Sequence, residues 1–173
     1  MGRKEKPMLV GTTHIPTIGE LLRRFRNECN LSLIEMAGLT NFSNSHLSNV
    51  EVGRTNISFD ILMAYEEYLG FAPHEIGAFF LLLHTEIIPI NSLFTSVSQI
   101  DLNNAVEIAR VLDCFPELLK HVAVFIKKTE CGLSGYLDSY QPQVADELRR
   151  HNRQSLVIFK LNTLLKSQSE RDL

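Results

Sequence analysis

Closely spaced polar side chains carry the clearest potential for chemistry in this 173-residue chain. If residues 44–49 are helical, Asn44, Ser45, Ser48 and Asn49 lie on one side of the helix, because residues three and four apart are neighbours on a helix surface. Their amides and hydroxyls donate and accept hydrogen bonds, but none is a strong acid, base or metal ligand. This chemistry favours recognition of a partner over catalysis.

Two short helices joined by a tight turn are predicted over residues 31–58. Ser32 can cap the first of them, and Glu35 lies three residues later, which completes a Ser-x-x-Glu capping box. Met36 and Ala37 are expected to face inward, and Ala37 is small enough to let a second helix cross closely.

The turn and the second helix have their own local signals. Residues 40–42 form the predicted turn, in which Asn41 tolerates a left-handed backbone. Ser43 can cap the second helix, whose Leu47 and Val50 are expected to point into the core. Capping, turn and periodicity together predict a helix-turn-helix motif.

Residues 17–69 resemble the Cro/CI-like (XRE) helix-turn-helix family, with a first helix predicted at 18–28 and a fourth helix capped by Ser58. The junction Asn56-Ile57-Ser58 is similar to the Rgg/MutR branch of Gram-positive regulators. Three segments carry the family resemblance: Asn30-Leu31-Ser32, similar to Gly-Leu-Ser; Leu47-Ser48-Asn49-Val50-Glu51-Val52-Gly53-Arg54, similar to Leu-Ser-x-Ile-Glu-x-Gly-Lys/Arg; and Ile57-Ser58-Phe59-Asp60-Ile61-Leu62, similar to the start of the fourth helix.

The resemblance implies that the second helix of the motif reads double-stranded DNA. Asparagine pairs with adenine through two hydrogen bonds, so an A·T-containing half-site is expected. The alternative is that these are ordinary solvated polar residues, and branch members often carry arginine at the positions of Asn44 and Asn49. The expected DNA-contacting residues are Asn44, Ser45, His46, Ser48, Asn49, Arg54 and Thr55.

By the same resemblance, Arg26 and Glu51 match positions that form an ion pair between the first helix and the end of the recognition helix. Such a pair fixes orientation more than it adds stability. The alternative is two independent surface charges, although Phe25 and Val50 beside them are predicted core residues.

Charge argues against strong DNA binding by a single subunit. The whole chain has a formal net charge of −3, and residues 17–70 contain four arginines against seven acidic residues, also −3. DNA affinity depends on neutralising phosphates, so a single copy of this acidic segment is expected to bind DNA weakly and in a salt-sensitive way. A basic flexible arm over residues 1–16 would help, and a homodimer would double the phosphate contacts.

The rest of the chain is predicted to be helical. Helices are expected to start near Pro73, Asp101, Phe115 and Pro142, with Gly132 and Gly135 breaking the chain. The chain therefore divides into a helix-turn-helix DNA-binding domain (17–85) and a helical bundle or short helical-repeat domain (90–173) for dimerisation or sensing. The C-terminal domain has more apolar residues than one thin layer of helices needs to bury. Part of this surplus is therefore expected to form a subunit interface, the alternative being an intrachain core: Phe125, Ile126, Leu156, Phe159 and Leu164.

Several other classes of protein are disfavoured. Three widely spaced cysteines and six scattered histidines lack metal-site spacing, and the chain has no phosphate-binding glycine loop or nucleophile elbow. We therefore expect no enzyme activity, no cofactor and no metal. The apolar run at residues 76–83 is too short to span a membrane, and reduced cysteines favour a cytoplasmic protein.

The sequence thus predicts an all-α, cytoplasmic, dimeric, sequence-specific DNA-binding transcriptional regulator, with a peptide or protein effector as a candidate partner of the C-terminal half. The alternative is a helix-turn-helix-fold interaction module that binds another regulator rather than DNA.

Overall fold

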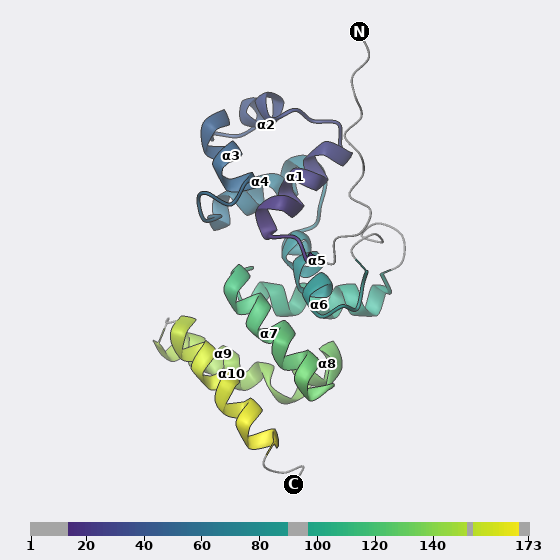
Figure 1. Cartoon of the computed structure of the whole chain (residues 1–173), viewed down its shortest axis with the longest axis vertical. Coiled ribbons are helices and arrows are strands. Elements are labelled where there is room, and N and C mark those ends of the chain that lie inside the picture. Colours follow the sequence, from purple (N-terminus) through teal and green to yellow (C-terminus); the bar gives the residue numbers. More distant parts are fainter. Residues whose placement is uncertain (1–13, 90–96, 152–153, 170–173) are drawn as a thin grey trace.

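The computed structural model describes residues 14–89, 97–151 and 154–169, and every regular element in these ranges is an α-helix. The elongated molecule carries its first four helices at one end and α9 and α10 at the other (Figure 1). The helices are α1 (Ile18–Glu28), α2 (Leu33–Leu39), α3 (Asn44–Glu51), α4 (Phe59–Leu69), α5 (Glu75–His84), α6 (Gln99–Val111), α7 (Pro116–Thr129), α8 (Gly132–Ser139), α9 (Gln141–His151) and α10 (Gln154–Ser169). The predicted all-helical fold is confirmed.

Local capping explains where the first helices begin. α2 starts with the predicted box: the Glu35 amide donates to Ser32 Oγ (3.1 Å), and the Ser32 amide donates to the Glu35 carboxylate (2.7 Å). α1 has an equivalent box between Thr17 and Glu20. α3 begins after Ser43, which accepts from a backbone amide as predicted. Each cap satisfies amides that a helix end would otherwise leave unpaired.

The left-handed backbone position differs from the expectation. Asn41 has no positive φ; the position is taken by Asn30, with φ 56°, in the turn between α1 and α2. Asn30 is the residue that corresponds to glycine in the Gly-Leu-Ser motif, so the need for a left-handed residue falls there. The turn before α3 closes instead through the Phe42 amide, which donates to Thr40 Oγ1 (3.4 Å).

α1 and α3 cross at unusually short range because the crossing residue is Gly19. A Cβ atom built on Gly19 would lie 2.3 Å from the Val50 carbonyl oxygen and 3.2 Å from the Glu51 carbonyl oxygen. These carbonyl oxygens belong to the backbone of α3 and cannot shift to make room for a Cβ atom, so only glycine fits at this position. The crossing fixes the end of α3 against the start of α1.

α5 is the central helix of the molecule. It contacts α1 and α4 on one side and α6 and α7 on the other, and all eight residues from Ile76 to Leu83 are buried. Its start is capped from α4, because the Glu66 carboxylate accepts from the amides of His74 (2.9 Å) and Ile76 (3.0 Å). The two halves therefore share one core, and the division at residues 85–90 stays a prediction.

The C-terminal half corrects two expectations. Gly132 does lie at a break, since α7 ends at Thr129 and α8 begins at Gly132, whose φ is 67°. Gly135 does not break the chain, because it lies inside α8, which is anchored by buried Leu133 and Tyr136. Phe125 and Ile126 are buried against neighbouring helices of the same chain, so neither can supply a subunit interface.

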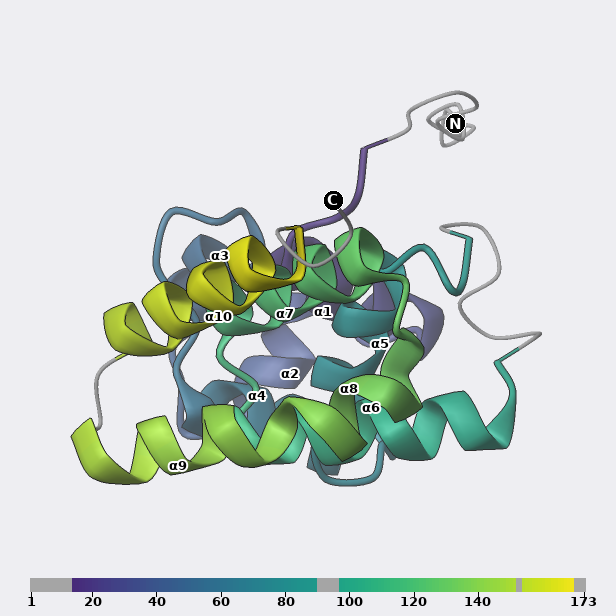
Figure 2. The same cartoon turned by 90° about the horizontal axis from the view of Figure 1, so that it is seen from below.

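The last two helices, α9 and α10, contact one another, and α10 also packs on α7 (Figure 2). Leu164 is half-buried in α10. The side chains of Leu156 and Phe159 lie outside the described residues, as does most of the predicted basic arm.

Candidate nucleic-acid interface

The exposed face of α3 is set by what the helix buries. Leu47 is 0% exposed and Val50 2% exposed, and both join the core shared with α1 and α4. Burial of this pair leaves Asn44 and Ser45 exposed. The remaining predicted contact residues of α3 are half-buried: His46, Ser48 and Asn49. The polar residues singled out in the sequence therefore share the outer side of one helix.

The acidic residue of α3 is turned away from this face. Glu51 is 3% exposed, and its carboxylate receives two hydrogen bonds from the Arg26 guanidinium, Nε to Oε1 and Nη2 to Oε2, both 2.7 Å. The outer face of α3 therefore carries no negative charge. Arg54 and Thr55 are exposed in the loop that follows, so the first charge after the helix is positive.

The Arg26 and Glu51 pair is the centre of a buried network. The Tyr65 hydroxyl of α4 donates to Glu51 Oε1 (2.7 Å), and Arg26 Nη1 donates to the Leu31 carbonyl (2.7 Å). One ion pair thus ties α1, α3, α4 and the turn before α2 together. The hydrogen bonds that Arg26 donates to Glu51 raise the pKa of Arg26, and burial raises the pKa of Tyr65, so both side chains keep their protons.

Sequence reasoning identified Arg26 and Glu51 but missed two members of this network. Tyr65 follows Glu51 by fourteen residues, and no local pattern distinguishes it from other apolar positions of α4. The Leu31 carbonyl is a backbone group, which a side-chain motif cannot reveal. Both follow only from the way the helices pack.

Three other acidic residues of the domain cap helices. Glu20 and Glu35 belong to capping boxes, and hydrogen bonds within these boxes lower the pKa of Glu35. Glu66 is 4% exposed and caps α5, where burial raises its pKa. Glu28 on α1, and Asp60 and Glu67 on α4, remain exposed. Apart from buried Glu51, the acidic residues of the domain therefore lie on helices other than α3.

Residues 22–76 match the family model of the helix-turn-helix domain. This part of the chain is therefore similar to the helix-turn-helix family, in line with the resemblance seen in the sequence. The match runs from α1 into the start of α5, and it does not separate branches of the family, so the similarity to the Rgg/MutR branch stays a prediction. A helix-turn-helix domain of this type is characteristic of DNA-binding regulators. No curated protein and no solved structure matches the chain.

Among the described residues, no group of three or more histidine, cysteine or acidic side chains could hold a metal ion. None of the helices in the described part of the chain is both long and apolar enough to cross a membrane. The cysteines in these ranges are free thiols, with Cys114 buried and the pKa of its thiol raised to about 12 by that burial.

Proposed function

We propose that this chain is a sequence-specific DNA-binding transcriptional regulator that acts in the cytoplasm as a homodimer. The observation that carries the proposal is the outer face of α3, which offers amides and hydroxyls, hides its one acid in an ion pair and is followed by exposed Arg54. Such a face can enter the major groove without repelling phosphates.

In this proposal, Asn44, Ser45 and Asn49 contact base edges. An asparagine amide matches the N6 donor and N7 acceptor of adenine, so the half-site contains A·T pairs at the contacted positions. Arg54 and Thr55 contact the phosphates that flank these base pairs. A positive side chain beside the groove binds phosphate whatever the base sequence is.

Dimerisation follows from the charge balance. A single helix-turn-helix domain with four arginines against seven acidic residues makes too few phosphate contacts to bind DNA at the salt concentration of a cell. Two heads related by a two-fold axis double these contacts and read two half-sites about one helical turn apart. Control of a promoter is then steric or by recruitment.

The reading face is tested by two single substitutions. Asn49→Ala should weaken binding to the specific site by about 1–3 kcal/mol and leave non-specific binding nearly unchanged, whereas Arg54→Ala should weaken both alike and reduce the salt slope by about one unit. Fluorescence anisotropy across a salt series measures both effects. Asn103→Ala, on the exposed surface of α6, is the control. Equal losses on both DNAs for Asn49→Ala would assign Asn49 to the backbone.

Assembly is tested by light scattering on the full chain. We expect a dimer at tens of micromolar, because the proposed function needs two heads. The full chain is the right material, since removing the C-terminal half would expose the apolar surface of α5. A protein that remains monomeric at about 50 μM would contradict the dimer model, because specific DNA binding by one acidic head is not expected.

The second candidate is a protein-interaction module. Exposed Glu28, Asp60 and Glu67 are negative charges that a basic partner protein could bind. The salt series separates the two candidates: an interaction module would bind no DNA sequence above the non-specific level at any salt concentration.

A further inference from the structure

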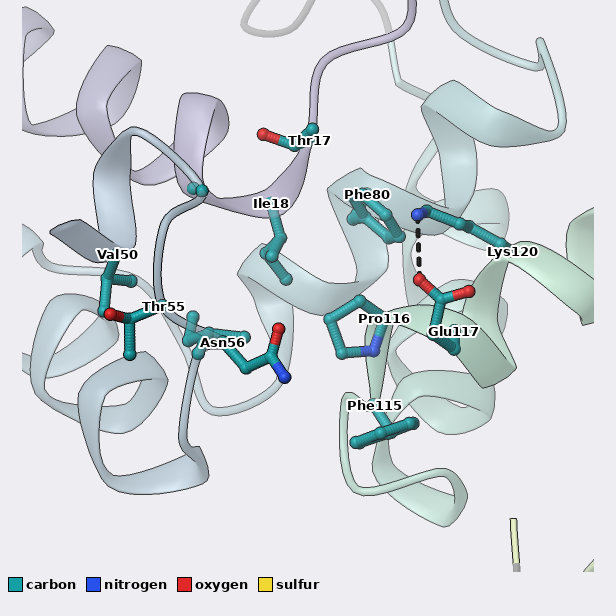
Figure 3. A pocket seen from close by; sticks show the side chains of 13 residues that line it. Thr17, Ile18, Val50, Thr55, Asn56, Phe80, Phe115, Pro116, Glu117 and Lys120 are labelled. Carbon is teal, nitrogen blue, oxygen red and sulfur yellow. Dashed lines mark hydrogen bonds and ion pairs between the residues drawn. The ribbon is translucent and has the colours of Figure 1, made fainter. Parts of the chain in front are cut away.

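A cavity of about 310 Å³ opens between the helix-turn-helix domain and the C-terminal half (Figure 3). The domain contributes the start of α1 and the loop over residues 53–57 that follows the recognition helix. The central helix α5 contributes Phe80, and the C-terminal half contributes the start of α7. Its volume lies at the small end of the range for ligand sites, about 300–1,000 Å³.

The inner wall of the cavity is apolar. Ile18, Val50 and Phe80 are buried side chains that belong to the shared core. Ile57, Phe115 and Pro116 are only half-buried, and Phe115 and Pro116 lie across the gap from Ile18 and Asn56 in Figure 3. These half-buried groups keep apolar surface in water, and a ligand that covers it would be stabilised by the hydrophobic effect.

The rim of the cavity carries polar groups that can form hydrogen bonds to a ligand. The Asn56 amide points into the gap and makes no hydrogen bond to any described residue. Lys120 Nζ donates to Glu117 Oε1 (3.0 Å), and both side chains are partly exposed. A surface pair of this kind is worth at most about 1 kcal/mol, so Lys120 can change partner at little cost.

We propose that this cavity binds a small apolar carboxylic acid, of the size of an aromatic or branched-chain amino or keto acid. The apolar body would cover Ile57, Phe115 and Pro116. The carboxylate would accept hydrogen bonds from Lys120 and the Asn56 amide, and charge-assisted bonds of this type are the stronger class. Glu117, released from Lys120, accepts an α-ammonium group where the ligand has one.

The position of the cavity links a ligand to DNA binding, a consequence that rests on the proposed function. The loop over residues 53–57 carries Arg54 and Thr55, and it forms one wall while α7 forms the other. A ligand that touches both walls favours one conformation of this loop against α7. The affinity of the dimer for its two half-sites then changes by the same factor as the affinity for the ligand.

The experiment is calorimetric titration of the full chain, without DNA, with L-phenylalanine, phenylpyruvate and phenethylamine. Both carboxylates should bind with dissociation constants of about 1 mM or lower, as expected for about a dozen non-hydrogen atoms, and the amine should not. Tighter binding of the amino acid than of the keto acid would place the ammonium group on Glu117; equal binding would leave the carboxylate as the only anchor.

Variants locate the site. Lys120→Gln should weaken binding of both acids at least tenfold, and Asn56→Asp should do the same by adding negative charge beside the carboxylate. The control is Lys128→Gln, an exposed lysine of the same helix that does not line the cavity. Absence of binding by both acids, equal binding of the amine, or unchanged binding in folded Lys120→Gln would each overturn the proposal. Because DNA is absent, failure here leaves the DNA-binding proposal untouched.

Discussion

Replacing Glu51 with alanine should lower the free energy of unfolding by about 3–5 kcal/mol, the largest effect expected from a single polar substitution in this chain. The change removes the partner of a guanidinium that is 6% exposed and leaves its charge buried with only the Leu31 carbonyl and Asn27 as acceptors. The Tyr65 hydroxyl loses its acceptor as well. Denaturant unfolding followed by circular dichroism measures the loss.

Two companion variants separate a buried pair from a general effect of charge. Glu67→Ala removes an exposed acid of α4 and should change the free energy of unfolding by less than about 0.5 kcal/mol. Replacing both members, as in Arg26→Met with Glu51→Leu, should recover much of the loss, because no unpaired charge remains. A loss below about 1 kcal/mol for Glu51→Ala would show that the two side chains are hydrated and independent.

Leu47→Ala should destabilise the protein by about 2–5 kcal/mol, the second large effect. Leu47 is 0% exposed on the inner side of α3, so truncation leaves a cavity that the surrounding helices fill only in part. The measurement is the unfolding midpoint together with helicity. Ser48→Ala, on the half-buried neighbouring position, should cost less than about 1 kcal/mol. A fully stable Leu47→Ala protein that fails to bind DNA would contradict the placement of this side chain in the core.

The first four helices could be predicted because their signals are local. Ser32 with Glu35, and Ser43 and Ser58 as caps, are each decided within a few residues of chain. The error at Asn41 has a physical origin: asparagine tolerates a left-handed backbone, but between α1 and α3 the position that adopts one is Asn30, where α1 ends.

The C-terminal half was harder to predict because its structure depends on contacts distant in sequence. Glycine weakens a helix by only about 1 kcal/mol, so packing of Leu133 and Tyr136 is enough to keep α8 helical through Gly135. An apolar stripe also does not say what covers it, which is why the sequence predicts a subunit interface at Phe125 and Ile126, although these α7 residues are buried in the core of the same chain.

In the candidate site, too, locally determined features could be predicted from the sequence and those that depend on distant contacts could not. The residues of the outer face of α3 could be selected from spacing and resemblance, and their contacts with bases stay a prediction. The inward turn of Glu51 onto Arg26 and Tyr65, and the cavity beside residues 53–57, depend on how helices far apart in sequence meet. No sequence pattern predicts the full Glu51 network or the cavity.

The most direct test of the central claim is selection of bound sequences from a randomised DNA pool with the full-length protein. The account predicts enrichment of a two-fold symmetric site whose half-sites contain A·T pairs and lie about one helical turn apart, with Asn49→Ala losing preference at an A·T position. A pool that shows no enrichment after repeated rounds, while the protein remains folded, would contradict sequence-specific DNA binding.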